Sequence, residues 1–156
     1  MEQQVAILRN LAARMGVPPL REVAKLPGIK EAYRVTVHYG AMRAPDSCST
    51  LTIDRTMQPA LASVYLGFFN HKVITKRIAL QQYEVLRTGL IRLRFDHLTD
   101  QPNAPFHDVD LWLVERAANG FNKSVMLAPD NAPGTHAEVV KLVRQHLPEA
   151  VRELQG

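Results

Sequence analysis

The fold is decided by residues 110–128, which read DLWLVERAANGFNKSVMLA. Asn119-Gly120 separates two apolar runs, and this dipeptide is the strongest short-range signal of a β-hairpin because both positions accept positive φ angles. Apolar side chains alternate to both sides of the first run, Trp112 and Val114 to one and Leu111 and Leu113 to the other. We therefore expect a hairpin of Asp110–Ala118 and Phe121–Ala128 that is covered on both faces.

A second pair of strands is expected closer to the N-terminus. Apolar and polar residues alternate over Tyr33–Tyr39 and again over Leu51–Ile53, which indicates two half-buried strands joined by a loop at Gly40–Ser47. Matching the apolar faces pairs Val35 with Ile53, Val37 with Leu51, and Arg34 with Asp54. Opposite charges directly across a strand pair are favourable, so this register is consistent on both faces.

Helices are expected near both ends of the chain. Apolar residues recur at three- and four-residue spacing over residues 5–15, and Gly16 provides a C-terminal stop. A short helical piece over Leu20–Leu26 follows. At the other end, Thr135 and Glu138 have the spacing of a capping box, and an apolar stripe continues from there to Leu154.

The last helix contains Pro148, which should kink it because the proline ring excludes one backbone hydrogen bond.

The middle of the chain is predicted to be helical. Residues 59–69 place apolar side chains at i, i+3, i+4, i+7 and i+8, and residues 73–88 are mostly good helix formers that end at Gly89. Residues 73–75 (Val-Ile-Thr) would also suit a strand. Ile91–Phe95 alternates apolar residues with arginines, which indicates a third strand.

These elements predict an α+β fold in one domain, residues 1–156. An antiparallel sheet of about five strands would pack against N- and C-terminal helices. A helical excursion would separate strands 2 and 3, giving the order α-ββ-α-βββ-α.

Composition narrows the class of protein. The chain is 46% hydrophobic and 22% charged, which is typical of a globular domain, and its one cysteine excludes an internal disulfide. No run approaches the roughly 18 apolar residues of a membrane span, and the first residues lack the features of a secretory signal. We therefore expect a cytoplasmic protein without a membrane partner.

The net charge of +4 is unevenly distributed. Residues 1–78 carry 11 basic and 5 acidic residues, a net +6, whereas residues 79–156 carry 8 basic and 10 acidic residues, a net −2. Such asymmetry indicates either an anionic partner or complementary contacts between subunits.

Three groups of residues could carry chemistry. The polar face of the first strand pair gathers Arg34, Thr36, His38, Cys48, Thr50, Thr52 and Asp54. If that face lined a cleft, His38 and Cys48 would be neighbours, and an imidazole can activate a thiol as a nucleophile; the candidate catalytic set is therefore His38, Cys48 and Asp54. The alternative is a solvated sheet face with an incidental cysteine.

The other two groups would bind ions. His97, His107, Asp108 and Asp110 bracket a proline-containing loop and supply ligands that suit a transition metal, although their spacing matches no known metal motif and such aspartates commonly cap turns. Arginines suited to phosphate or carboxylate cluster in the basic segment 72–94: Arg77, Arg87, Arg92 and Arg94. For the arginines, the alternative is a face that is exposed to solvent or that contacts another subunit.

The first functional hypothesis is a non-enzymatic binding or interaction module that self-associates as a homodimer or other homo-oligomer, with a second subunit covering an apolar face. The alternative is a small enzyme or ligand-binding protein with a pocket between sheet and helices. A further alternative is nucleic-acid or anion binding through segment 72–94. The sequence contains neither a glycine-rich phosphate loop nor a nucleophile elbow, so no cofactor is expected.

Overall fold

The computed structural model describes residues 2–67, 71–105 and 107–151. In chain order the elements are α1 (Glu2–Arg14), α2 (Leu20–Ala24), β1 (Ile29–His38), β2 (Ser47–Asp54), β3 (Pro59–Tyr65), β4 (Ile74–Arg77), α3 (Leu80–Arg92), β5 (Leu111–Ala118), β6 (Phe121–Leu127) and α4 (Gly134–His146). Short 3-10 turns lie at Gly40–Met42, Phe95–His97 and Pro148–Ala150.

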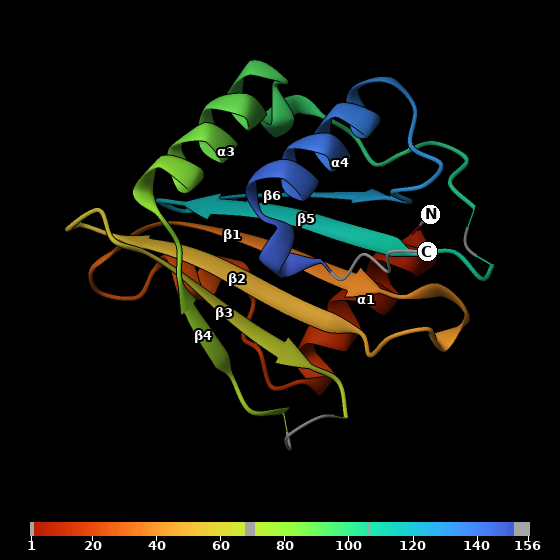
Figure 1. Ribbon diagram of the computed structural model, residues 1–156, viewed down its shortest axis with the longest axis horizontal. Coiled ribbons are helices and arrows are strands. Elements are labelled where there is room, and N and C mark those ends of the chain that lie inside the picture. Colours follow the sequence, from red (N-terminus) through yellow and green to blue (C-terminus); the bar gives the residue numbers. More distant parts are fainter. Residues whose placement is uncertain (1, 68–70, 106, 152–156) are drawn as a thin grey trace.

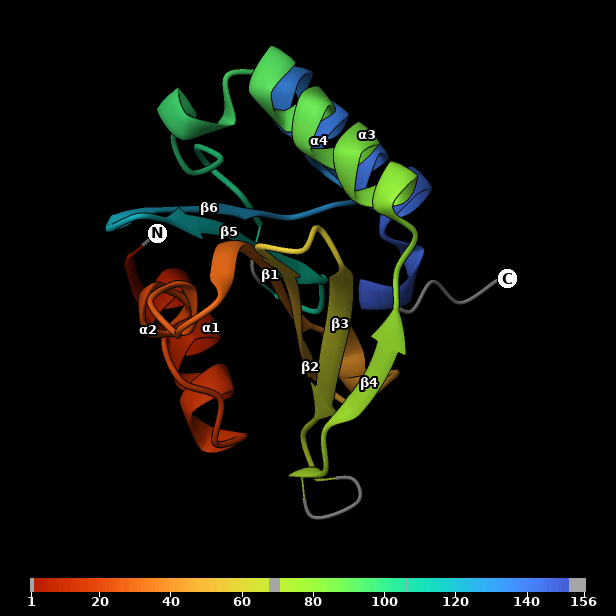
Figure 2. The same ribbon diagram turned by 90° about the vertical axis from the view of Figure 1, so that its left-hand side faces the viewer.

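The strands form one six-stranded antiparallel sheet in the order β4-β3-β2-β1-β5-β6. Helices α1 and α2 cover one face of this sheet, and α3 and α4 cover the other (Figures 1 and 2). The α+β class with an antiparallel sheet between helices is therefore confirmed. None of the described helices is long and apolar enough to cross a membrane.

The Asn-Gly hairpin forms as predicted, with Ala118 opposite Phe121 on either side of the turn. The first strand pair also forms, but its predicted register is wrong by four residues. Val35 lies opposite Ser49 and Tyr33 opposite Leu51. Strand β2 already starts at Ser47. The sequence did not reveal this start, because the small residues there are buried in the sheet without being apolar and so show no apolar alternation.

The predicted helix over residues 59–69 is wrong, since Pro59–Tyr65 is strand β3. Both faces of β3 carry apolar residues: Leu61 packs in the core beneath α3 and α4, and Val64 packs on the side of α1. A strand apolar on both sides loses its period of two, and its spacing then imitates that of a helix. Pro59 occupies the first position of the strand, where the ladder tolerates a missing N–H.

The predicted helix over residues 73–88 is divided. Its first residues form strand β4, which is the alternative that we gave for residues 73–75. Its later residues belong to α3. The predicted strand at Ile91–Phe95 is wrong because α3 continues through Gly89 to Arg92. Gly89 does not end the helix: a Cβ there would lie 2.6 Å from Leu142 Cδ2 of α4, so the glycine allows the two helices to pack closely.

The last helix differs from its prediction at both ends. It begins at Gly134, and its N-terminus has no side-chain cap, so the capping box of Thr135 is wrong. Pro148 does not kink the helix; α4 has already ended at His146, and Pro148 begins a 3-10 turn. Leu154 lies outside the described residues.

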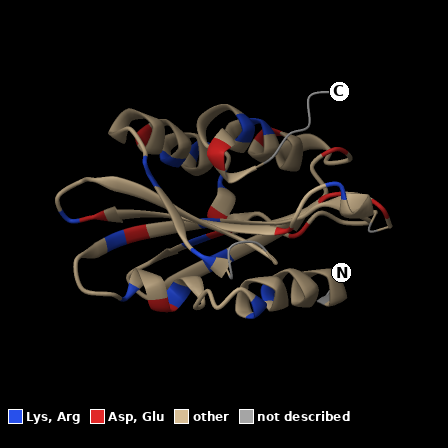
Figure 3. Cartoon of the chain, turned by 60° about the horizontal axis from the view of Figure 1, so that its bottom comes forward, with Lys and Arg blue, Asp and Glu red and all other residues tan. Residues whose placement is uncertain are grey.

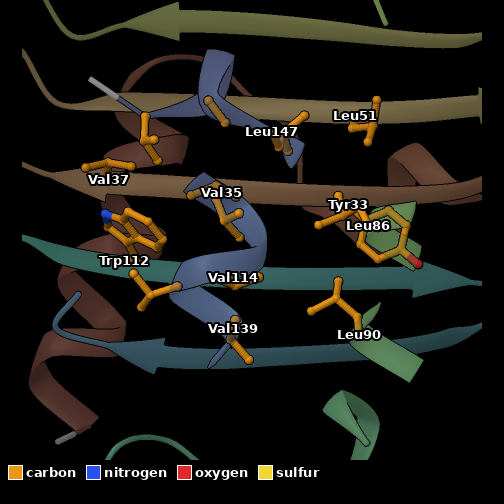
Figure 4. Packing of buried hydrophobic residues seen from close by; sticks show 14 of the residues in the cluster. Tyr33, Val35, Val37, Leu51, Leu86, Leu90, Trp112, Val114, Val139 and Leu147 are labelled. Atoms are coloured by element: carbon orange, nitrogen blue, oxygen red, sulfur yellow. The ribbon is translucent and has the colours of Figure 1, made fainter. Parts of the chain in front are cut away.

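The larger core fills the space between the sheet and helices α3 and α4. Figure 4 shows Trp112 and Val114 of β5 together with Val35 and Val37 of β1, beneath Val139 of α4. Trp112 is 1% exposed. This core therefore contains one of the two apolar sides of the predicted hairpin.

The second core covers the opposite side of that hairpin. Leu111 and Leu113 pack against Leu8 and Leu11 of α1. This apolar side of the hairpin is thus covered by the N-terminal helix of the same chain.

The two edges of the sheet differ. At β6 the chain before β5 closes part of the edge: Asp100 Oδ1 accepts the Met126 N–H at 2.8 Å, and the Gln101 N–H donates to the Met126 carbonyl at 2.9 Å. Edge strand β4 instead carries Lys76 and Arg77 and is exposed throughout. Basic side chains on an edge strand oppose its pairing with other chains.

Candidate functional site

A pocket of about 410 Å³ lies between the segment that follows α1 and the face of β2, β3 and β4. Helices α1 and α2 pack mainly over β1 and β5, so Thr52, Ala60 and Ala62 on the neighbouring strands stay partly exposed. The lining is mostly apolar or hydroxylic and consists of Met15, Gly16, Val17, Pro18, Val23, Arg34, Cys48, Thr50, Thr52, Ala60, Ala62, Val64, His71, Val73 and Thr75. We call this the Arg34 pocket.

Every residue of the Arg34 pocket belongs to residues 1–78, the part of the chain with net charge +6. Figure 3 shows Lys and Arg along the helical layer of α1 and α2 and on β4, which flank the pocket. The exposed basic side chains of this layer include Arg14, Arg21 and Lys25. Hence a long-range positive potential and an apolar cavity coincide on one face of the molecule.

A row of residues in register crosses all six strands, and its members on β1 to β4 line the Arg34 pocket. From β6 to β4 these are Ser124, Glu115, Arg34, Thr50, Ala62 and Thr75. Directly opposite residues on one face have their Cβ atoms about 4.5–5.5 Å apart, so each side chain touches the next. At the β6 end of the row, Arg9 Nη2 of α1 donates to Ser124 Oγ at 2.9 Å.

Arg34 is the central residue of the row and is only 2% exposed. Its Nε donates to Thr50 Oγ1 at 2.9 Å, and its Nη1 donates to the Pro18 carbonyl at 2.8 Å. The second bond ties the segment between α1 and α2 to the sheet. Nη2 is buried and has no hydrogen-bond partner among the described residues.

Glu115 lies directly across from Arg34 on the β5 side. Burial raises the pKa of its carboxyl, and the positive charges of Arg34 and Arg9 oppose that rise. Glu115 lines a second, smaller pocket of about 250 Å³ that also contacts Arg34 but lies towards α1. Arg34 therefore lines two cavities, and Glu115 lines only the one that lies towards α1.

The predicted catalytic set is not assembled in one place. Cys48 lines the Arg34 pocket, and its pKa is raised by burial. His38 instead contacts Asp46 through Nδ1 at 3.1 Å, and that hydrogen bond raises the pKa of His38. Asp54 ends the same strand six residues beyond Cys48, about 20 Å away at the usual rise of about 3.3 Å per residue.

Asp54 has a local role in the turn that follows β2. Its Oδ1 accepts the Thr56 N–H at 2.9 Å, the Thr56 hydroxyl at 2.6 Å and the Gln58 N–H at 3.1 Å. These bonds, that from the Thr56 hydroxyl first, lower the pKa of Asp54. Its predicted partner Arg34 is buried elsewhere in the sheet.

The candidate metal ligands also have separate roles. Asp110 accepts the Gly40 N–H at 2.8 Å and pairs with Arg43. His97 lies in the 3-10 turn after α3, and Asp108 occupies a left-handed turn position with φ of 57°. Within residues 2–67, 71–105 and 107–151, His107 included, no group of three or more His, Cys, Asp and Glu side chains could hold a metal ion.

The four candidate anion-binding arginines do not share a strand face. Arg77 is on β4, Arg87 and Arg92 are on α3, and Arg94 follows that helix in a left-handed conformation. Arg87 Nε lies 3.5 Å from Glu31 Oε1. Arg94 lines a small pocket of about 240 Å³ on the side of α3.

Arg34, which lines the Arg34 pocket, belonged to none of the candidate catalytic, metal-binding or anion-binding sets. The sequence did place Arg34, Cys48, Thr50 and Thr52 on one strand face, and the structure places them together in the Arg34 pocket. The segment after α1 covers these residues only in the folded chain, so the sequence around them does not indicate that they line a pocket. The chain matches no protein-family model, and no curated protein is significantly similar to it in sequence.

Proposed function

We propose that this protein is a binding module that holds a small, largely apolar molecule in the Arg34 pocket. The observation that carries the proposal is an apolar cavity of about 410 Å³ between the N-terminal helical layer and the sheet. This volume falls within the roughly 300–1,000 Å³ of small-molecule pockets, which are mostly apolar with a few polar groups that fix orientation. Val64, Ala62 and Val73 would supply the apolar contacts.

Binding is favoured over catalysis by the state of the reactive side chains. A nucleophilic cysteine needs a depressed pKa and a base beside it, whereas burial raises the pKa of Cys48. His38 is engaged with Asp46. The pocket offers threonine hydroxyls, one guanidinium and the His71 imidazole as polar groups, and His71 has neither Cys48 activated as a thiolate nor His38 beside it to form a catalytic set.

A neutral, environment-sensitive dye, N-phenyl-1-naphthylamine, tests the proposal. Its fluorescence should rise on binding to the native protein, and Ala62→Phe should abolish the rise because the new ring fills the cavity beside Thr50. Ala6→Phe is the matched control, since Ala6 is exposed on α1 outside the pocket. Bound dye should also slow alkylation of Cys48, the only cysteine in the chain.

Dye binding that survives Ala62→Phe unchanged, or is lost equally in Ala6→Phe, would contradict the proposal. The Cys48 measurement on the native chain decides the matter if Ala62→Phe does not fold. Unaltered alkylation at saturating dye would show that the dye binds elsewhere.

Self-association is the second candidate, and strand β4 is the observation that favours it. Val73 is 51% exposed and Ile74 37% exposed at this edge of the sheet. Two copies could pair along their β4 edges, although Lys76 and Arg77 oppose such pairing. Sedimentation equilibrium tests this candidate: a monomer at all concentrations up to the millimolar range would exclude it.

A further inference from the structure

We infer that the ligand of the Arg34 pocket is a monocarboxylic acid with an apolar chain, and that its carboxylate binds the free Nη2 of Arg34. The inference rests on the proposed function and adds the chemical class of the ligand. It has three supports: an unused donor, the surrounding charge, and the shape of the lining.

The unused donor is the first support. Arg34 is 2% exposed, and two of its three guanidinium nitrogens already donate to Thr50 and Pro18. Nη2 carries two further N–H groups that find no acceptor among the described residues. Buried polar groups are almost always hydrogen-bonded, so an unpartnered buried donor on a residue that lines an apolar cavity calls for an acceptor from that cavity.

The surrounding charge is the second support, and it selects a monoanion. The pocket is built from the segment with net charge +6, which attracts anions. Glu115, however, lies across from Arg34 and already supplies one negative charge near the guanidinium. A single carboxylate can share the guanidinium with Glu115, whereas a doubly charged phosphate would place excess negative charge around one cation.

The lining is the third support. On the strand side, most of the lining is small or apolar (Ala60, Ala62, Val64 and Val73), and the other polar groups there are Thr52, Thr75 and His71. A charged group at Arg34 therefore adjoins a mostly apolar compartment, which suits an aliphatic or aromatic tail. The ligand chemistry is accordingly amphipathic, with its charged end at the buried end of the site.

Three probes of equal chain length test the inference by isothermal titration: decanoate, decanol and decyl phosphate, each below its critical micelle concentration. Decanoate should bind at least about tenfold more tightly than either of the others, as expected for a charge-assisted hydrogen bond gained or lost. Arg34→Met should weaken decanoate binding by about ten- to a hundredfold and leave decanol nearly unchanged. Arg55→Met, an exposed arginine outside the pocket, is the matched control.

The Arg34 Nε–H resonance gives a second readout that needs no substitution. Decanoate should shift this resonance and decanol should not, because only the carboxylate contacts the guanidinium. If Arg34→Met fails to fold, this shift and the ligand series on the native chain decide the question.

The outcomes separate the two proposals. Equal affinities for decanoate and decanol, both blocked by Ala62→Phe, would overturn the carboxylate assignment and leave the binding module standing. Tightest binding of decyl phosphate would likewise overturn the assignment in favour of a dianion. Failure of all three probes and of the neutral dye to bind would overturn both.

Discussion

The substitution Arg34→Met tests the structural role of the polar row, independently of any ligand. Methionine roughly keeps the apolar length of the side chain but removes the donors to Thr50 Oγ1 and to the Pro18 carbonyl, at 2.9 and 2.8 Å. Hydrogen bonds to charged groups contribute about 1.5–3 kcal/mol each. Because two such bonds are lost, we expect the free energy of unfolding to fall by about 3–6 kcal/mol.

The loss should depend on pH through Glu115. The folded-state pKa of Glu115 is raised by burial, so folding favours its protonated form, and its contribution to stability declines as pH rises through that pKa. Without the positive charge of Arg34 this pKa rises further, and the decline extends to higher pH. Arg34→Met should therefore cost more stability at about pH 8 than at about pH 5.

Urea denaturation followed by Trp112 fluorescence at both pH values measures the effect, with Arg55→Met as the surface control. Adding Glu115→Gln to Arg34→Met should remove the extra loss at high pH, because no buried carboxylate remains to be ionised. An equal loss at both pH values, or strict additivity of the two substitutions, would refute the coupling of Arg34 to Glu115.

Three further outcomes are expected. The hydrogen bond to Asp46 raises the His38 pKa, so its contribution to stability is lost as pH rises through that pKa. The melting temperature of the native protein should therefore fall between about pH 6 and pH 8, and His38→Asn should remove this fall. Gly40→Ala should lower the free energy of unfolding by about 1–3 kcal/mol in chemical denaturation, since its Cβ would lie 2.6 Å from the backbone of Asp108. Deletion of residues 1–16 should yield a chain that precipitates or unfolds at a much lower urea concentration, because Leu111 and Leu113 lose their cover; a soluble product with an unchanged urea midpoint would show that α1 is not the required cover of β5.

The elements that could be predicted from sequence have strong local signals. The Asn119-Gly120 turn fixes its own hairpin, and the stripe of α1 ends at a glycine. Strand β3 could not be recognised because both of its faces are covered, which removes the alternation that identifies a strand. Gly89 misled the prediction of α3, because the contact that requires a glycine comes from Leu142, more than fifty residues away.

The candidate site could be predicted only in part, for a related reason. The alternation in β1 and β2 places Arg34, Cys48 and Thr50 on one face in both the predicted and the observed register, because a slip of four residues preserves the face of every side chain. Whether that face is exposed to solvent or buried depends on the segment after α1. The hydrogen bond from Arg34 to Pro18 that holds this segment in place forms only in the folded chain. The pocket is thus a tertiary property of residues whose local pattern describes an ordinary strand pair.

The unlike protection of the two sheet edges has a consequence for handling the protein in different buffers. The β6 edge is closed in part by two hydrogen bonds at Met126, one accepted by Asp100 and one donated by Gln101, which ionic strength hardly affects. The β4 edge relies on the charges of Lys76 and Arg77, whose reach shrinks from about 8 Å at physiological salt to about 3 Å at 1 M. Concentrated salt should therefore weaken the protection of the β4 edge only. Molecules that associate at high salt should pair edge to edge through β4.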